Sequence, residues 1–554
     1  MSINSKPLDA VRRSCGVIEN ALIDSHAAGR ISRRDFLRHC SVLGLSAPGL
    51  AAAIGSLGMA TLPRPARAAA PGGTLRIAQI GPASALEPVK VADPGGITQL
   101  SVCGEYLCVN GPDFTLRPSL AESWSPNSDG SIWTFRVRNS VTFHNGKPLT
   151  AADVVASFER LTDPDSESNA LTAFAGYLSK GGTRQRDDAT VEFHLDAANG
   201  NFPYLVSSDS HNAIILPADY RGDYETNQIG TGPFKLESYT PRTGASYLRQ
   251  DSYWGAKALP DRLEFTFHAD DKSQAQALRD GQADILSGLP RLAAAALSGD
   301  PAFEILRTPA TSHNQLHMRT DMDPFKDPRV RRAVALCLDR PKLVQGLFAG
   351  RARIGNDSPF APDYPSTDKA VSQRQRDVAA AKQLLEAAGL KSGFQVALTA
   401  QQYQEIPAFA LAIQDALAEI GGKVEITTLE PGAYYADGVF GKSPWLDCVM
   451  GITDYVHQGA PNAHLTAPLR SDGAWNSARY KNPAYDRLVT SYIAALEPES
   501  QRKAAGEIQK LLLDETPVIF GYFHDHLTAV KKGVSGVVAS PLGHLWLAQA
   551  RLAS

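Results

Sequence analysis

Asp454 is the residue of this chain whose type and position most clearly suggest chemistry. It follows an apolar, strand-like run at 446–450 and stands in the sequence Gly-Ile-Thr-Asp-Tyr at 451–455. A buried carboxylate is costly unless it meets a cation or hydrogen-bond donors. The position therefore suits a carboxylate that binds a cationic group of a ligand. It also suits one that only caps the loop after the strand.

A second pattern, His524-Asp525-His526, consists of residue types that commonly bind metal ions. In a strand, however, the two histidines share one face while the aspartate points to the other, and no third ligand is identifiable. We therefore predict no metal site and no cofactor.

Patterns typical of enzymes are missing from the sequence. There is no Gly-x-Ser-x-Gly elbow, no His-Glu-x-x-His and no phosphate-binding Gly-x-x-x-x-Gly-Lys. The acidic pairs Asp187-Asp188 and Asp270-Asp271 lie in polar, turn-like stretches, which is typical of solvated loop charges. We expect a binding protein and not an enzyme, with any ATP hydrolysis left to another subunit.

The elements that must position these residues follow two different patterns. Alternating polar and apolar residues predict strands at 73–80, 131–138, 190–195 and 263–268, and a cap-like start at 150–153 predicts a helix to 161. Farther on, strands at 394–398 and 424–428 flank a helix at 407–420. This strand–helix–strand order predicts an α/β lobe with a partly parallel sheet.

An export signal precedes these elements. The sequence SRRDFLR at 32–38 stands before a charge-free, Gly/Ala-rich run at 39–63, and Ala66-Arg67-Ala68 offers a small-residue cleavage site. We expect residues 1–68 to be a twin-arginine signal peptide that directs the protein to the periplasm. The alternative is an uncleaved leader that acts as a weak membrane anchor.

Export changes the charge balance. Of 55 Lys and Arg and 58 Asp and Glu, nine and four lie in residues 1–68, so the remainder has a formal net charge near −8. No basic run survives there, which argues against a nucleic-acid partner.

Four of the six cysteines, Cys103, Cys108, Cys337 and Cys448, lie outside the predicted leader. They are too few to form a disulfide scaffold in so long a chain. Cys103 and Cys108 are close enough in sequence to form a local bridge, and the sequence leaves their redox state open.

Several short motifs follow one another along the chain. They are PSLAESW at 118–124, VTFHNG at 141–146, LTAADVVASF at 149–158, GTGPF at 230–234, YWG at 253–255, LRDGQADI at 278–285, and Pro324-Phe325 with RVR at 329–331. Each motif is weak alone, but their order and spacing make a chance resemblance improbable. In this order they resemble the solute-binding proteins of ABC importers, family 5, which include dipeptide, oligopeptide and nickel-complex binders.

The resemblance implies an α/β, two-lobed periplasmic binding protein fold of class II, cluster C type. Lobe I would comprise residues 69–310, with an inserted subdomain at about 115–216, and lobe II residues 311–524. Residues 525–554 would return to lobe I. Such lobes close around a ligand, and charge pairs discriminate more sharply in a site hidden from water.

The resemblance also implies ligand-binding residues, namely Asp454, Tyr455 and His457. In the peptide-binding members, an Asp-Tyr pair at this place supplies the carboxylate that meets the N-terminal ammonium of the ligand. His457 would line the cleft or touch a metal chelate. Two departures put the ligand type in question: many relatives carry Trp where this chain has Gly451, and Pro-Asp-Pro after the Tyr is replaced by VHQGAP at 456–461.

Other candidate contacts are less specific. Arg319 and Arg353 could bind a ligand carboxylate or could be surface arginines. The aromatic group Tyr434, Tyr435, Phe440 and Trp445 could stack on a ligand or pack in the core.

Together these observations predict a monomeric periplasmic receptor that captures a short peptide or similar amine-bearing solute and delivers it to an inner-membrane ABC permease. One alternative keeps the transport role with a non-peptide ligand, such as a metal chelate or a sugar-linked compound. The other is a sensory or chaperone-like binding protein that is not coupled to transport.

Overall fold

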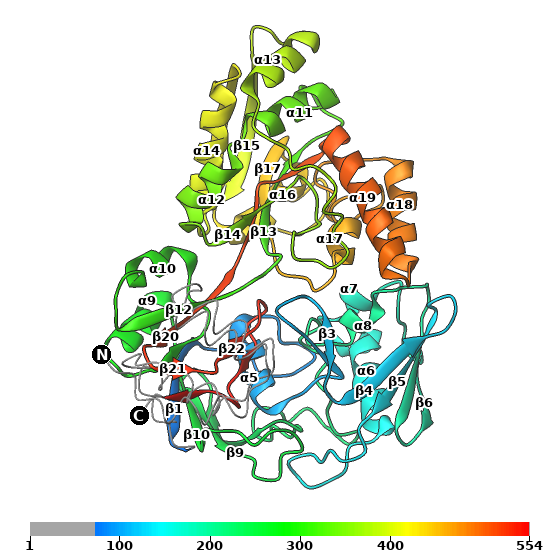
Figure 1. Ribbon diagram of the computed structural model, residues 1–554, viewed down its shortest axis with the longest axis vertical. Coiled ribbons are helices and arrows are strands. Elements are labelled where there is room, and N and C mark those ends of the chain that lie inside the picture. Colours follow the sequence, from blue (N-terminus) through cyan, green and yellow to red (C-terminus); the bar gives the residue numbers. More distant parts are fainter. Residues whose placement is uncertain (1–71, 553–554) are drawn as a thin grey trace, which may run out of the picture. The chain divides into compact units, whose positions relative to one another are not determined.

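The computed structural model describes residues 72–552 (Figure 1). The predicted signal peptide, with its twin-arginine motif and cleavage site, lies outside the described residues. Among the helices that the structure does describe, none combines the length and the apolar character needed to cross a membrane.

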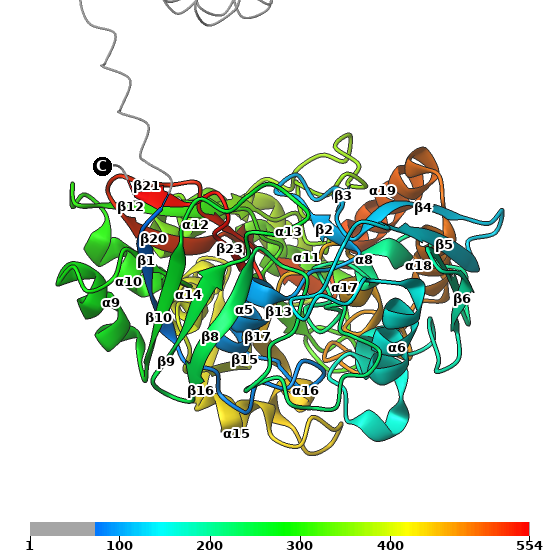
Figure 2. The same cartoon turned by 90° about the horizontal axis from the view of Figure 1, so that it is seen from below.

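Seven strands form the first sheet, in the order β12-β20-β11-β1-β10-β9-β8. β1 pairs in parallel with β10 and β11, and the other neighbours are antiparallel. Figure 2 shows β1, β10 and β8 of this sheet from below. The strands predicted at 73–80 and 263–268 are confirmed as β1 and β10. The bounds are β1 Thr74–Ile80, β8 Phe234–Thr240, β9 Gly244–Arg249, β10 Arg262–His268, β11 Ile285–Leu286, β12 Phe303–Thr308 and β20 His526–Lys531.

Helices and short hairpins surround this sheet. The helix α5 is buried along almost its whole length, and Asp93 caps its start by accepting a hydrogen bond from the Gly96 amide. The elements are α5 Pro94–Cys103, α9 Asp271–Arg279, α10 Arg291–Leu297, β21 Val534–Ser535, β22 Val538–Ala539, β23 Leu545–Trp546 and β24 Arg551–Leu552.

A four-stranded antiparallel sheet, β4-β5-β7-β6, forms a separate layer. The predicted capping box opens α6, because the Asp153 carboxylate accepts from the Thr150 amide at 2.8 Å and from its hydroxyl at 3.0 Å. The bounds here are β2 Cys108–Asn110, β3 Leu116–Pro118, β4 Ala121–Pro126, β5 Ile132–Val137, α6 Ala151–Thr162, the 3₁₀ helix Pro164–Ser166, α7 Leu171–Phe174, β6 Thr183–Asp187, β7 Thr190–His194 and α8 Phe202–Leu205.

The third sheet has five strands in the order β16-β15-β17-β13-β18. β15 is parallel to both β16 and β17, and β13 is antiparallel to β17 and β18. The predicted partly parallel sheet is therefore confirmed. The bounds are β13 His313–Met318, β15 Phe394–Gln401, β16 Gly422–Leu429, β17 Met450–Tyr455 and β18 Val518–Phe520.

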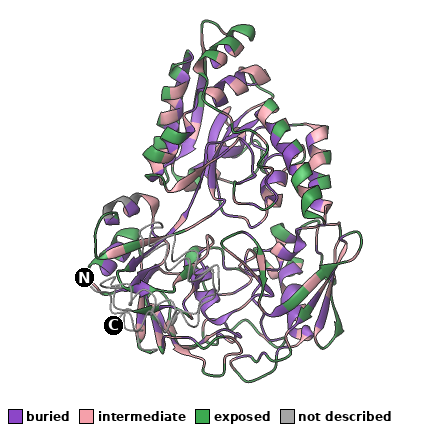
Figure 3. Cartoon of the chain, in the orientation of Figure 1, coloured by how far each residue is buried: buried purple, intermediate pink, exposed green. Residues whose placement is uncertain are grey.

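Helices cover this sheet, and its strands are mostly buried while the helices keep exposed faces (Figure 3). A two-stranded ribbon of β14 and β19 adjoins it. These elements are α11 Pro328–Cys337, α12 Arg340–Phe348, β14 Ala352–Ile354, α13 Val378–Ala387, α14 Ile406–Ala418, α15 Pro431–Tyr435, α16 Pro444–Asp447, α17 Asn462–Thr466, α18 Pro483–Ala494, α19 Pro498–Glu515 and β19 Tyr522–His524.

Two short connections join the seven-stranded and five-stranded sheets. The chain leaves the first sheet after Thr308 and enters the other at His313, and it returns between Phe520 and His526. The His524 amide donates to the Ser312 carbonyl at 3.0 Å, so the two connections lie side by side. We propose that the lobes divide here, with lobe I at 72–310 and 525–552 and lobe II at 311–524, and use these names below.

The four described cysteines, Cys103, Cys108, Cys337 and Cys448, are free thiols. Burial raises the pKa of Cys337 and of Cys448 to about 12. Both thiols are therefore protonated at neutral pH. Cys103, Cys108 and Cys337 serve as small core residues, whereas Cys448 is partly buried.

Candidate functional site

Asp454 lies near the end of β17, at the edge of the five-stranded sheet where β15 and β16 also end. Its carboxylate accepts hydrogen bonds from the side-chain amide of Gln401, the last residue of β15, and from the hydroxyl of Tyr435 in α15. Both donors are neutral. The carboxylate thus has its position fixed but its negative charge unpaired by these partners.

Asp454 lines a cavity of about 170 Å³ that we call the cleft cavity. Its wall comes from both lobes and from the connection between them. Lobe I contributes Leu289 and Arg291, lobe II contributes Tyr403 and Asp454, and the returning connection contributes residues 524–527. The carboxyl ends of strands meet in this region, which is the usual place for ligands in open α/β sheets.

Tyr455 lines the same cavity. Its ring stacks on His313, with centroids 5.4 Å apart, and its side chain is only 8% exposed. Burial, reinforced by the Asp454 charge, raises the pKa of the Tyr455 hydroxyl. That hydroxyl has no hydrogen-bond partner among the described residues.

His457 lies apart from Asp454 and Tyr455. It lines a neighbouring cavity of about 290 Å³, together with Phe114 and Asp209 of lobe I. Its Nδ1 accepts from the Thr311 amide at 3.1 Å, and its Nε2 lies 3.7 Å from an Asp209 carboxylate oxygen. The structure thus gives His457 contacts between the lobes, and its role in binding ligand stays a prediction.

Arg291, at the start of α10, is a residue that the sequence reasoning missed. Its Nε donates to Glu405 at 2.7 Å across the lobes. Glu405 is buried, and its other oxygen accepts from the side-chain amide of Asn314 at 2.7 Å. A signal was available, since Arg291 closely follows the motif at 278–285 and β11, whose carboxyl end faces the same edge as that of β1.

The two arginines considered from the sequence are engaged elsewhere. Arg353 contacts the carboxylates of Asp363, at 2.5 Å, and Asp525, together with the Ala310 carbonyl. Arg319 pairs with Asp321 at 2.7 Å and donates to the Asp447 carbonyl. Neither lines the cleft cavity.

The aromatic group mostly packs in the core. Tyr434 and Trp445 are buried in one small cluster, whereas Phe440 is exposed beneath the guanidinium of Arg479, 3.7 Å from its ring centroid. Tyr435 is the member whose hydroxyl reaches Asp454.

His524 and His526 both line the cleft cavity. Burial lowers the pKa of His526 to about 4 and that of His524 well below its usual value, so both rings are neutral at pH 7. The Nδ1 of His524 has no partner among the described residues. Within that same part of the chain, no group of three or more acidic, histidine or cysteine side chains is arranged to hold a metal ion.

The absence of a side chain at Gly451 has a steric explanation. A Cβ there would lie 2.6 Å from the Cys448 sulfur and 2.6 Å from Cε1 of His317. The imidazole of His317 and the thiol of Cys448 therefore fill the space beside the strand, and a tryptophan side chain could not enter without displacing them.

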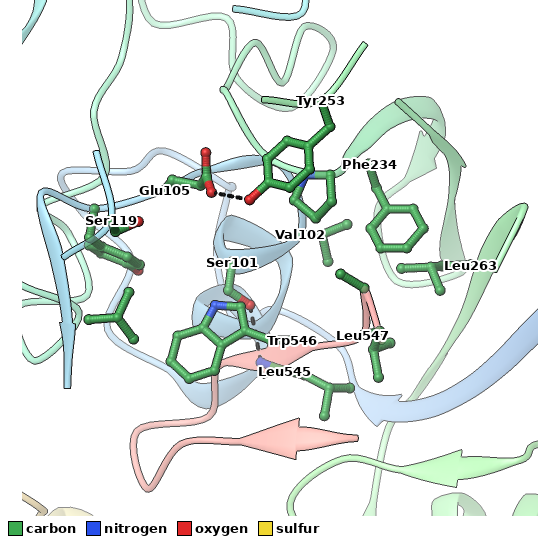
Figure 4. A pocket seen from close by; sticks show the side chains of 15 residues that line it. Ser101, Val102, Glu105, Ser119, Phe234, Tyr253, Leu263, Leu545, Trp546 and Leu547 are labelled. Atoms are coloured by element: carbon green, nitrogen blue, oxygen red, sulfur yellow. Dashed lines mark hydrogen bonds between the residues drawn. The ribbon is translucent and has the colours of Figure 1, made fainter. Parts of the chain in front are cut away.

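A third cavity, of about 250 Å³, lies within lobe I, and we call it the lobe I cavity (Figure 4). Apolar side chains such as Phe234, Leu263 and Leu547 form much of its wall, and Trp546 and Tyr253 also line it. Glu105 provides its one carboxylate.

Two of the family motifs converge on Glu105. Its oxygens accept from the Thr231 hydroxyl at 2.8 Å, the Tyr253 hydroxyl at 2.7 Å and the Trp254 indole at 2.8 Å. Desolvation by burial raises the Glu105 pKa. Gly230 admits no side chain, because a Cβ would lie 1.9 Å from the Cys103 carbonyl oxygen. The GTGPF and YWG motifs thus build lobe I and lie apart from the cleft cavity.

Comparison with known proteins adds independent information. Residues 115–446 match the family described as "Bacterial extracellular solute-binding proteins, family 5 Middle". The Di/tripeptide-binding protein 2 of Pseudomonas aeruginosa (strain UCBPP-PA14) is 28% identical over 460 residues, which cover 77% of this chain and 85% of that protein. The glutathione-binding protein GsiB of Salmonella typhimurium is 26% identical over 441 residues, with the same coverage of 77% and 85%.

A solved structure shows the same fold. The periplasmic binding protein DppA from Helicobacter pylori, in complex with the peptide STSA, superposes with a TM-score of 0.68 at 22% identity. The match covers 87% of this chain and 98% of that one. The predicted two-lobed binding-protein fold is therefore confirmed.

Proposed function

Because the chain belongs to family 5 of the bacterial extracellular solute-binding proteins, we propose that it captures a short peptide or a similar amine-bearing solute for an ABC importer. Asp454 is the proposed anchor for the ammonium group. The chain would make or break no bond, and closure of the lobes would enclose the ligand.

The observation that carries this proposal is the state of the Asp454 carboxylate. It stands in a cavity between the lobes, is oriented by Gln401 and Tyr435, and receives hydrogen bonds only from neutral groups among the described residues. A ligand ammonium would supply the missing positive charge in a place of reduced water access. The named ligands of two relatives, di- and tripeptides and glutathione, all carry a free amine.

The rest of the proposal concerns partners and location. We propose that the protein works as a monomer in the periplasm, arrives by the twin-arginine route and delivers its ligand to an inner-membrane permease. The periplasmic location is supported by family members that are periplasmic binding proteins.

A non-peptide ligand is the second candidate. One observation favours it: the altered loop at 456–461 begins with Val456, which lines the cleft cavity together with Asp454. A solved structure titled as a binding protein in complex with agropinic acid shares the fold, with a TM-score of 0.64 at 24% identity.

Mass spectrometry of the small molecules released when freshly purified protein is denatured tests the choice. We expect one peptide or a mixture of short peptides. A single compound without a primary amine would contradict the ammonium-binding role of Asp454 and would favour the second candidate.

A further inference from the structure

The geometry points to Phe114 of lobe I as a positioning residue that holds the two lobes together and so sets how readily the protein stays closed. This inference goes beyond the proposed function, because it concerns the balance between open and closed protein and not the ligand. Phe114 stands in the turn between β2 and β3 and does not line the cleft cavity.

The phenyl ring of Phe114 is buried in a hydrophobic cluster that belongs to the other lobe. Its side chain is 1% exposed, and the other buried members of this cluster, so far as the structure describes them, lie at residues 360–523 of lobe II. The ring meets that of Tyr364 edge-on, with centroids 5.5 Å apart, and its centroid lies 5.5 Å from that of His457. Parting of the lobes would expose the ring to water, and burial of a side chain of this size favours the closed arrangement by about tenfold or more.

The backbone of Phe114 indicates that the hairpin alone does not account for this residue. Its φ is +58°, in the left-handed region that favours glycine and is rare for a bulky side chain. The turn is closed by a hydrogen bond from the Phe114 amide to the Gly111 carbonyl at 3.0 Å, and a glycine at 114 could make the same turn with less strain. Burial of the ring in lobe II offsets this strain.

Hydrogen bonds within each lobe hold the two sides of this contact in place. In lobe I, the Tyr204 hydroxyl donates to the Phe114 carbonyl at 2.6 Å. In lobe II, the Tyr364 hydroxyl donates to the Gln458 carbonyl at 2.6 Å. The ring and the surface that receives it are therefore ordered before they meet, which lowers the entropic cost of closure.

A polar contact beside the ring joins the same two lobes. Asp209 of lobe I accepts hydrogen bonds from the side-chain amide of Asn110 at 3.2 and 3.0 Å, and it lies 3.7 Å from Nε2 of His457. The loop after His457 is so close that a Cβ at Gly459 would lie 1.6 Å from an Asp209 carboxylate oxygen. None of these residues lines the cleft cavity, so the contact does not use the groups that we propose for the ligand.

Small-angle X-ray scattering of the ligand-free protein tests the inference, with Phe114→Gly as the variant. Glycine suits the positive φ, so this variant should fold as well as the native chain while it lacks the ring. We expect the ratio of open to closed molecules to rise at least tenfold, which increases the radius of gyration above that of the native protein. Phe114→Leu, which keeps an apolar side chain, should stay close to the native radius.

Binding of dialanine, measured by titration calorimetry, gives a second readout. When fewer molecules are closed before the ligand arrives, the apparent affinity falls in proportion. We expect Phe114→Gly to bind dialanine about threefold more weakly or worse. Saturating dialanine should return the variant to the radius of the liganded native protein.

Arg242→Gly is the matched control. Arg242, in the turn between β8 and β9 of lobe I, also has a positive φ of 62°, but its side chain is exposed. Its replacement relieves the same kind of strain without removing a buried ring. The radius of gyration and the affinity for dialanine should therefore match those of the native protein.

The outcomes separate this inference from the proposed function. A native radius for ligand-free Phe114→Gly overturns the inference, and so does an equal increase for Arg242→Gly. An increased radius with unchanged affinity for dialanine overturns the positioning role, because closure would then not limit binding. If dialanine binds none of the proteins while the radii differ as expected, the peptide-binding proposal fails and the role of Phe114 is supported.

Discussion

The cleft cavity and the lobe I cavity differ in how their polar groups are satisfied. In the lobe I cavity, Glu105 accepts three hydrogen bonds, and the Tyr106 hydroxyl has partners at His211 and His544. In the cleft cavity, Asp454 receives side-chain hydrogen bonds only from neutral donors among the described residues.

We propose that this difference separates a structural carboxylate from a binding carboxylate. A carboxylate at a cavity wall that meets only neutral donors leaves its charge for a cationic group of a ligand. By this criterion we propose the smaller cleft cavity as the binding site, although the lobe I cavity is larger and more apolar. Removing the Glu105 carboxylate should therefore lower stability and leave ligand affinity unchanged. Removing the Asp454 carboxylate should lower ligand affinity and leave stability unchanged.

Glu105→Ala should give the largest loss of stability. The variant leaves the Thr231 hydroxyl, the Tyr253 hydroxyl and the Trp254 indole without their acceptor, and an unpaired buried donor costs about 1–3 kcal/mol. We expect the free energy of unfolding to fall by about 2 kcal/mol, measured by urea denaturation. Ligand affinity should stay within twofold, and a large affinity loss without loss of stability would reverse the roles of the two cavities.

Asp454→Ala should lower ligand affinity and leave stability unchanged, which is the reverse of the effect of Glu105→Ala. Loss of the ammonium partner should weaken binding of an amine-bearing ligand more than tenfold, which is more than about 1.4 kcal/mol. Because Asp454 is only partly buried, the unliganded protein should keep its free energy of unfolding. Titration calorimetry and urea denaturation measure the two quantities, and an unchanged affinity would remove Asp454 from the site.

Lowering the pH should change the free energy of unfolding in opposite directions through two histidines of β13 and through Glu105. Burial lowers the pKa of His313 and His317 in β13 from the usual 6.5 to about 4. Between these values the unfolded chain binds protons that the folded chain does not, so these histidines stabilise the fold above pH 6.5 and lose that contribution as the pH falls toward 4. Glu105 has the reverse shift, so its protonation at lower pH favours the folded state.

We therefore expect each of these two histidines to lower the free energy of unfolding by about 2 kcal/mol between pH 7 and pH 5. His317→Gln should flatten this slope, and Glu105→Gln should steepen it. Urea denaturation at several pH values gives the slopes. Parallel slopes in all three proteins would show that neither group controls the acid response.

Long elements with regular periodicity could be predicted from the sequence, because alternation or a helical repeat records which face is buried. This holds for β1, β10 and the β15–α14–β16 unit. The two-residue strand β11 and the β14–β19 ribbon are too short to show a regular polar–apolar pattern. They form because strands distant in sequence supply their hydrogen bonds.

Prediction of the candidate site from the sequence has the same limit, because contacts between residues distant in sequence cannot be seen in it. Asp454 and Tyr455 could be proposed because the family resemblance implies a binding Asp-Tyr pair after this strand. Gln401, Tyr435 and Arg291 reach the same place from three other elements, and only the parallel arrangement of strands brings them together. The replacement of tryptophan by Gly451 could be noticed in the sequence, but its cause required the positions of His317 and Cys448.

Tyr435→Phe should give the smallest effect, and it tests how far the Asp454 carboxylate depends on one of its two donors. The variant removes one of two neutral donors to Asp454 and leaves the Gln401 amide in place, so affinity for an amine-bearing ligand should fall about threefold. Tyr434→Phe is a matched control on the same helix, because the Tyr434 hydroxyl donates to the Ile452 carbonyl at 2.8 Å. It should lower stability and leave affinity unchanged. If Tyr435→Phe instead weakens binding as much as Asp454→Ala does, the carboxylate depends on this hydroxyl for its position, and orientation outweighs charge at this site.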